Sequence, residues 1–217
     1  MDGAGRSADG GGPGERRSTG IAALDRALGG GVRPGSLVAV VGGPAAPTEP
    51  VLYAVAAPRP TRYLTALRPA DEVEAALDRH GAGGATVGRV DGDELLADPG
   101  THLGGIDDGA TVVVDPITDA EQGGREDYRR LLAAGKRALR RTGGVAVLHC
   151  FETTPPTLRR DLTLARADHV WRIDLTREGE PEVLLTVRKA RGHDFPSRRF
   201  VLDVAADGVT ATAADGQ

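Results

Sequence analysis

The chain contains few cysteine, lysine and aromatic residues. Of its 217 residues only Cys150 is a cysteine, so no disulfide can form within the chain, and a disulfide-stapled secreted fold is excluded. Aromatic residues make up 3%, which leaves valine, leucine and alanine to fill a core. Lysine occurs only at Lys136 and Lys189, and this preference for arginine is typical of a GC-rich or salt-adapted genome.

Long apolar runs and an excess of positive charge are also missing. The longest apolar runs, such as Ser36–Val41 and Val51–Ala57, are far shorter than the roughly 20 residues that cross a bilayer, and the N-terminus lacks an apolar secretion signal. We therefore expect a cytoplasmic protein with no membrane partner. The formal net charge of −4 excludes a global positive field that would recruit nucleic acid, so any such contact must be local.

Composition divides the chain into one domain and two tails. Residues 1–17 contain six glycines and almost no apolar side chain, so we expect a disordered N-terminal tail. Residues 213–217 are similar, which predicts a loose C-terminal tail. The remaining segment, 18–212, is long enough to bury a sizeable core as a single domain.

Predicted strands and helices alternate through this domain. Four apolar runs have the composition of strands buried on both faces of a sheet, at 36–41, 61–65, 111–115 and 145–149. Helices are predicted at 71–80 and about 126–142, with shorter ones at 49–57 and after Ser18 or Thr19, either of which can cap its helix. Runs rich in β-formers follow at 169–174, 183–189, 199–204 and 208–212, separated by turns such as Glu178-Gly179 and Asp207-Gly208. This order predicts a three-layer α/β fold, with a mostly parallel sheet and a C-terminal antiparallel extension.

Two distant stretches resemble the KaiC-like branch of the RecA superfamily of P-loop ATPases. From Ser18 to Gly42, a helix, a glycine turn, a buried strand and a glycine come in that family's order. Val187-Arg-Lys-Ala-Arg-Gly192, followed by Arg199-Phe-Val-Leu-Asp and Asp207-Gly-Val, is similar to its Lys-x-Arg-Gly strand and closing hairpin. With a Walker B-like strand ending at Asp115, the resemblance covers about 18–212. It implies a RecA-like fold with a nucleotide site after Gly42.

The loop after Gly42 departs from the pattern G-x-x-x-x-G-K-[ST]. In that pattern backbone amides converge on the phosphates, lysine neutralises them and the hydroxyl holds Mg²⁺. Here Pro47 replaces the second glycine, Thr48 the lysine and Glu49 the Ser/Thr, so a carboxylate stands where phosphate would lie. Repulsion between two like charges is on the order of 4 kcal/mol at about 4 Å and an effective dielectric of about 20. We expect a degenerate Walker A motif, a pseudo-ATPase and no cofactor. The candidate nucleotide-site residues are Gly42, Gly43, Thr48, Glu49 and Asp115.

Two alternatives remain open for the carboxylates of this site. Glu49 can supply the negative charge that the helix N-terminus favours in place of phosphate. Alternatively, Glu49 and Asp115 can hold Mg²⁺ for weakly bound ATP. Asp115 can also simply bond to neighbouring backbone. The resemblance further implies a carboxylate after the second strand, where Ala66-Leu67-Arg68 has none.

Basic residues form two further candidate surfaces. Lys189 and Arg191 project from one face of a strand, either as a solvated edge or, as the resemblance implies, toward a neighbouring subunit's nucleotide in trans. This favours a homo-oligomer, or a hetero-oligomer with an intact KaiC- or RecA-like paralogue. One face of the helix at 126–142 is either solvated or a contact for nucleic acid or an acidic partner. Its residues are Arg129, Arg130, Lys136, Arg137, Arg140 and Arg141.

Histidine and cysteine offer little further chemistry. The five histidines, at 80, 102, 149, 169 and 193, lack metal-ligand spacing, so we expect no metal site. His149 and Cys150 are adjacent on a strand and point to opposite faces, which excludes a thiol–imidazole pair. We therefore predict a non-catalytic regulatory or assembly subunit. The alternatives are a divergent ATPase that uses Glu49 and Asp115 for Mg²⁺, and a recombination accessory that binds DNA.

Overall fold

The computed structural model describes residues 15–176, 180–192 and 198–214. Its strands are β1 (Leu37–Gly42), β2 (Thr61–Thr65), β3 (Thr86–Arg89), β4 (Thr111–Asp115), β5 (Val145–Phe151), β6 (His169–Leu175), β7 (Val183–Ala190), β8 (Arg198–Ala205) and β9 (Gly208–Ala213). They form one sheet in the order β3-β2-β4-β5-β1-β6-β7-β8-β9. The strands from β3 to β6 in this order are parallel, and β7, β8 and β9 continue the sheet antiparallel.

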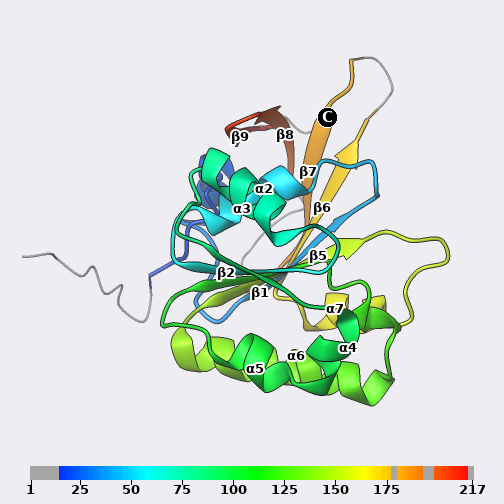
Figure 1. Ribbon diagram of the computed structural model, residues 1–217. Helices are drawn as coiled ribbons and strands as arrows, with labels where there is room; N and C mark the ends of the chain where they lie inside the picture. Colours follow the sequence, from blue (N-terminus) through cyan, green and yellow to red (C-terminus); the bar gives the residue numbers. More distant parts are fainter. Residues whose placement is uncertain (1–14, 177–179, 193–197, 215–217) are drawn as a thin grey trace, which may run out of the picture.

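Helices cover both faces of the sheet (Figure 1). They are α1 (Ala22–Ala27), α2 (Glu49–Ala56), α3 (Ala70–Arg79), α4 (Gly92–Ala97), α5 (Pro99–Gly104), α6 (Arg125–Thr142) and α7 (Arg160–Arg166), with a short 3-10 helix, η1 (Ala120–Gln122). The first three pack on one face and α4 to α7 on the other. β9 contacts α1 and α2, so the antiparallel extension closes back over the first helix layer.

The central strands are largely apolar because both of their faces are covered. Side chains alternate between the faces of a strand, so Val113 packs with the α1–α3 layer whereas Val112 and Val114 pack with the α4–α7 layer. All six residues of β1 and all five of β4 are buried. Each fully buried valine or leucine contributes roughly 1.5–3 kcal/mol. The two cores therefore hold the sheet between its helix layers.

The parallel strands give the sheet two distinct edges. We call the edge where β1, β2, β4 and β5 end the carboxyl edge, and the edge where they begin the amino edge. Because these strands are parallel, the residues that follow Gly42, Thr65 and Asp115 all lie at the carboxyl edge.

The predicted α/β fold, with a mostly parallel sheet and an antiparallel extension, is confirmed. The predicted cap of the first helix is wrong. α1 starts after Ile21, without a side-chain cap, and the Ser18 and Thr19 hydroxyls bond to the Asp25 carboxylate at 2.6 and 2.7 Å. Gly20, at φ +75°, separates Ser18 and Thr19 from the helix, and a Cβ there would lie 1.9 Å from the Ala54 carbonyl oxygen.

The described residues extend slightly beyond the segment predicted as the domain. Arg17 pairs with Val32, and Ala213 ends β9. Residues 1–14 and 215–217, the Glu178-Gly179 turn and His193 lie outside the described residues. In the described part of the chain, no helix combines the length and the apolar character needed to cross a membrane.

Candidate functional site

In the turn between β1 and α2, most positions either have no backbone amide hydrogen or bond it to a carbonyl group of the turn itself. Three of the eight residues from Gly43 to Pro50 are proline and have no amide hydrogen. The Ala46 amide donates to the Gly43 carbonyl at 2.9 Å, and the Thr48 amide donates to the Ala46 carbonyl at 2.8 Å. A phosphate-binding loop works by pointing several free amides at its ligand. This turn directs two of its five amides at its own carbonyl groups.

The Thr48 side chain points into the protein. Thr48 is completely buried and precedes α2, yet its hydroxyl makes no capping bond to the helix. The Thr48 Oγ1 atom lies 2.8 Å from His149 Nε2 instead. The Thr48 methyl group packs on Gly42, where a Cβ would approach it to 2.5 Å. Gly42 therefore allows Thr48 to fold back against the end of β1.

Both carboxylate oxygens of Asp115 are engaged by buried side chains. Asp115 Oδ1 lies 2.5 Å from His149 Nδ1, and Asp115 Oδ2 accepts a short hydrogen bond from the Tyr63 hydroxyl. A carboxylate only accepts, so His149 Nδ1 donates to Asp115, and His149 Nε2 shares its hydrogen bond with the Thr48 hydroxyl. We call these four residues, Thr48, His149, Asp115 and Tyr63, the Thr48 network. It joins the turn after β1 to the ends of β5, β4 and β2.

The Thr48 network is closed to solvent. Thr48, Tyr63 and His149 are 0% exposed, and Asp115 is 6% exposed. Burial raises the pKa of Tyr63 well above its usual value, and the Asp115 charge and hydrogen bond raise it further, so the hydroxyl stays protonated. The order hydroxyl, imidazole, carboxylate is that of a nucleophilic triad. Since Thr48 is inaccessible, this arrangement stabilises the turn and cannot present its hydroxyl to a substrate.

An arginine and a tyrosine lie beside the Thr48 network. Arg68, in the turn after β2, donates to the Tyr53 hydroxyl at 2.5 Å and lies 3.9 Å from the Glu72 carboxylate. Burial raises the pKa of Tyr53, with further increases from the Asp115 and Glu49 charges, while Arg68 opposes the rise. Glu49 is the first residue of α2, as predicted. The turn after β2 thus carries the positive charge of Arg68, at the place where the resemblance implies a carboxylate.

A second buried network fixes the segment between β5 and α7. Glu121 in η1 is completely buried, and Arg160 donates to both of its carboxylate oxygens at 2.8–3.0 Å. The Thr157 and Thr163 hydroxyls also donate to Glu121, at 2.7 and 2.5 Å. A buried carboxylate needs such partners to remain charged. Glu121 was not predicted as a site residue, because its partners come from a segment about 40 residues away along the chain.

Lys189 and Arg191 lie at the amino edge, across the sheet from Thr48. Lys189 Nζ donates to the Leu164 and Ala165 carbonyls at 2.8 and 3.1 Å, and Arg191 donates to the Ala165 carbonyl at 3.2 Å. Both side chains therefore satisfy carbonyl groups at the end of α7, where cations are favourable. The Arg191 side chain remains 58% exposed, which leaves most of its guanidinium donors available. Its action in trans stays a prediction.

The basic residues of α6 divide into separate groups. Lys136 pairs with Asp168 at 2.6 Å and, with Arg140, lines a cavity at the amino edge. Arg141 donates to the Gly104 carbonyl at 2.7 Å. The remaining three residues are Arg129, Arg130 and Arg137. Together with Arg166 of α7 they line a groove of about 720 Å³. In the described residues no cluster of His, Cys, Asp and Glu has the geometry to hold a metal ion.

Cys150 is buried, and its Sγ atom contacts the Leu148 carbonyl at 3.6 Å. His149 bonds to Thr48 and Asp115 rather than to the thiol, which agrees with the prediction that these neighbours point to opposite faces. His149 itself was missed as a member of the site. The available signal was that β4 and β5 both carry a polar residue near their ends, Asp115 and His149.

Comparison with known proteins identifies the fold and the family. The KaiC-like protein PH0186 from the hyperthermophilic archaeon Pyrococcus horikoshii OT3 superimposes with a TM-score of 0.71, covering 92% of this chain and 100% of that one. The two sequences are 17% identical, so this likeness shows a KaiC-like, RecA-type fold and nothing more. No curated protein matches the sequence. The model of DUF7125, a family of unknown function, matches residues 16–215, and the chain therefore belongs to the DUF7125 family.

Proposed function

We propose that this chain is a non-catalytic regulatory or assembly subunit with a KaiC-like fold, which works in the cytoplasm without binding nucleotide. The observation that carries the proposal is the Thr48 network. Two polar groups of the candidate nucleotide site, the Thr48 hydroxyl and the Asp115 carboxylate, are already bonded to His149 and Tyr63. A nucleotide or Mg²⁺ ion that used either group would have to break these buried bonds, which supports the proposal.

The turn adds a second obstacle to phosphate. Pro47 and Thr48 stand where glycine and lysine would be needed, and Glu49 adds negative charge at the start of α2. The turn therefore offers fewer amides than a phosphate-binding loop and lacks its cation. The alternative of a divergent ATPase needs Asp115 and Glu49 to hold Mg²⁺, and Asp115 would have to give up two hydrogen bonds to do so.

Calorimetric titration with Mg-ATP and Mg-ADP tests the nucleotide part of the proposal. We expect no binding heat and no change in melting temperature. A matched variant, Pro47→Gly/Thr48→Lys/Glu49→Ser, restores the loop pattern and should gain nucleotide affinity if these three residues are the obstacle. Micromolar affinity of the unaltered chain would contradict the proposal and favour the divergent ATPase.

Exposed apolar side chains support an assembly role. Leu67, Leu158 and Leu175 are 58%, 62% and 36% exposed, and they follow or end β2, β5 and β6 at the carboxyl edge. Large exposed hydrophobic side chains are candidates for contacts in a protein interface. The partner proposed for this edge is a second RecA-like subunit, either a copy of this chain or an intact paralogue.

Sedimentation and ATPase measurements test the partner. Leu158→Ser should weaken self-association or association with an intact KaiC-like subunit. The unaltered chain should change that subunit's ATPase rate, and Arg191→Ala should reduce the effect. Arg188→Ala is the matched control, because it removes a neighbouring exposed arginine from the same strand. An ATPase rate that neither the unaltered chain nor Arg191→Ala alters would count against this role.

A second candidate function rests on the groove beside α6. Four arginines line it, with Glu126 as the one acidic lining residue, and Ala133 and Ala134 leave room for a partner. We propose local DNA binding as the alternative for this surface. Binding should weaken steeply with salt, and Arg137→Glu/Arg166→Glu should abolish it. DNA binding that survives these charge reversals would exclude the groove.

A further inference from the structure

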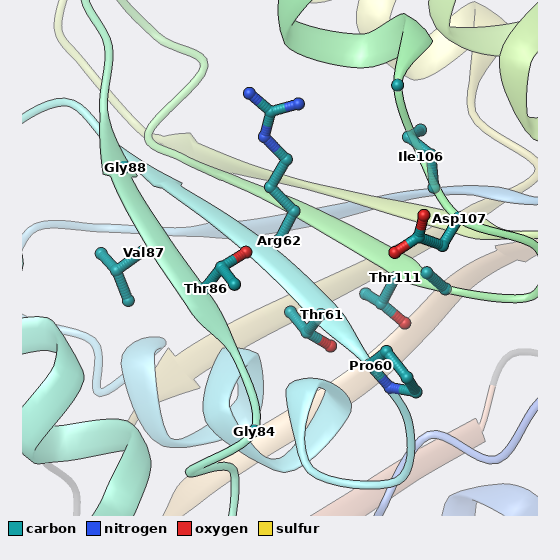
Figure 2. Close-up of a pocket in the computed structure, with 12 residues that line it drawn as sticks. Pro60, Thr61, Arg62, Gly84, Thr86, Val87, Gly88, Ile106, Asp107 and Thr111 are labelled. Carbon is teal, nitrogen blue, oxygen red and sulfur yellow. The ribbon is translucent and has the colours of Figure 1, made fainter.

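A cavity of about 550 Å³ lies at the amino edge, beside the outer strand β3 (Figure 2). On the face that packs with α4–α7, the inner strands present apolar residues such as Val112 and Val114. β2 presents Arg62 in the same row as Val112, and its partner on β3 is Thr86. The apolar core therefore ends at β2, and the two outer strands border a polar space.

Two opposite charges face this cavity from different elements. Arg62 projects from β2, and one of its five guanidinium hydrogens is used by the Thr101 carbonyl, at 3.2 Å. Asp107 comes from the segment between α5 and β4, and its carboxylate has no hydrogen-bond or ion-pair partner among the described residues. Figure 2 shows the two groups on different sides of the space. They are thus available to a ligand that carries both signs of charge.

Further polar groups and three glycines complete the lining. Thr86 lies beside Arg62, and the buried Thr111 hydroxyl, where β4 begins, has no partner among the described residues (Figure 2). Gly84, Gly88 and Gly105 add no side chains to the space. A Cβ at Gly88 would meet only Leu64, at 3.7 Å, so packing does not demand glycine there. The missing side chain keeps the cavity open.

We propose that this cavity binds a free α-amino acid. Its volume falls within the roughly 300–1,000 Å³ typical of small-molecule sites. Arg62 recognises the carboxylate through paired N–H bonds, and Asp107 holds the ammonium group. A simple anion would meet the negative charge of Asp107, and a simple cation would meet Arg62, so the pair selects a zwitterion. No lining residue belongs to the Thr48 network, so this site and the nucleotide proposal are tested independently.

Thermal shift and calorimetry with single compounds test the proposal. The probes are the twenty proteinogenic amino acids, each alone, together with acetate, methylammonium and glycylglycine. At about ten times its dissociation constant, a bound amino acid should raise the melting temperature by about 3–6 °C. Acetate and methylammonium should have no effect. The proposal is overturned if no amino acid binds, if acetate binds as well as the best amino acid, or if only glycylglycine binds.

Matched variants locate the binding. Arg62→Leu and Asp107→Asn should each weaken binding by about 10- to 100-fold, because each removes a charged partner. Arg89→Leu and Asp108→Asn are their controls, since Arg89 lies on the other face of β3 and Asp108 is not a lining residue. These controls should bind as the unaltered chain does. Unchanged binding by both Arg62→Leu and Asp107→Asn would place the ligand elsewhere.

Gly88→Val tests the cavity without removing a charge. The new Cβ makes an ordinary 3.7 Å contact with Leu64, and valine suits a strand, so the melting temperature without ligand should not fall. Amino-acid binding should be lost, because the side chain fills the space between β3 and Arg62. Binding that is retained in a folded Gly88→Val protein would overturn the proposal.

Discussion

The two edges of the parallel sheet differ in how their polar side chains are partnered. At the carboxyl edge, Asp115 and Glu121 are buried and bonded to other side chains of the same chain. At the amino edge, Arg62 and Asp107 face a cavity and leave donors and acceptors unused. Open α/β sheets usually bind ligands beyond the carboxyl ends of their strands. Here Asp115 and Glu121 at that edge are bonded within the chain, whereas Arg62 and Asp107, with unused donors and acceptors, lie at the other edge.

This difference separates stability from binding within one fold. A buried polar group that loses its partner costs about 1–3 kcal/mol, so substitutions in the Thr48 network should act mainly on the free energy of unfolding. Substitutions of Arg62 and Asp107 should act mainly on binding, because both side chains are partly or fully exposed. Each prediction below tests one side of this comparison.

The largest effect is expected for Asp115→Ala. This change leaves the His149 and Tyr63 donors buried without an acceptor, which should lower the free energy of unfolding by about 3–5 kcal/mol. Urea unfolding measures the change. Tyr63→Phe removes a single donor and should cost less than Asp115→Ala. Asp108→Ala, at an exposed position, should cost less than about 0.5 kcal/mol, and equal losses at Asp108 and Asp115 would contradict the assignment.

A smaller loss of stability is expected for Thr48→Val. The substitution preserves shape but leaves the buried His149 Nε2 without its hydrogen-bond partner, so the free energy of unfolding should fall by about 1–3 kcal/mol. Thr48→Ser keeps the hydroxyl and should retain more of the stability than Thr48→Val does. Equal losses for the two variants would mean that the methyl contact with Gly42, rather than the hydrogen bond, stabilises the turn.

At the amino edge, Asp168 predicts a dependence on pH. Burial alone would raise the pKa of Asp168, but bonds from Lys136 and the Leu37 amide, with the charges of Lys136 and Arg191, outweigh it, so the pKa is lowered. A lowered carboxyl pKa stabilises the fold above the unfolded value of about 3.9, and this stability is lost as pH falls through the lower folded value.

Asp168→Asn should therefore reduce the free energy of unfolding by about 1–2 kcal/mol at pH 7 and by progressively less below about pH 4. Urea unfolding across this pH range gives the comparison. Asp203→Asn, at an exposed position on β8, controls for the general effect of removing a negative charge. If the Asp168 variant kept its full deficit in acid, its pairing with Lys136 could not be the cause.

The sequence predicted the buried strands well because burial on both faces leaves a continuous apolar run. β2 and β4 have the predicted bounds, and the other predicted strands differ by one or two residues at their ends. β3 was missed because Thr86-Val-Gly-Arg89 is a largely exposed outer strand without such a run. α7 was missed because only Thr163 of its seven residues is buried.

Less of the site could be predicted, because its contacts join distant strands. Thr48 was predicted as a site residue from its spacing after Gly42, and Asp115 from its position at the end of a buried strand. Strand periodicity tells which face His149 occupies but not that β5 lies between β4 and β1. The partners His149 and Tyr63 depend on that order. The loss of nucleotide binding stays a prediction.

The last prediction concerns the reactivity of the Cys150 thiol and involves no loss of stability. Burial raises the pKa of this thiol, the Glu121 charge raises it further, and Arg160 offsets only part of the rise. Since the thiolate is the reactive form, a disulfide probe should label the native chain at least about 100-fold more slowly than the chain unfolded in urea. Cys150→Ala leaves no thiol, which supplies the blank. Rapid labelling under native conditions would mean that the sheet opens near the end of β5, and the carboxyl edge would then be less closed than the Thr48 and Glu121 contacts require.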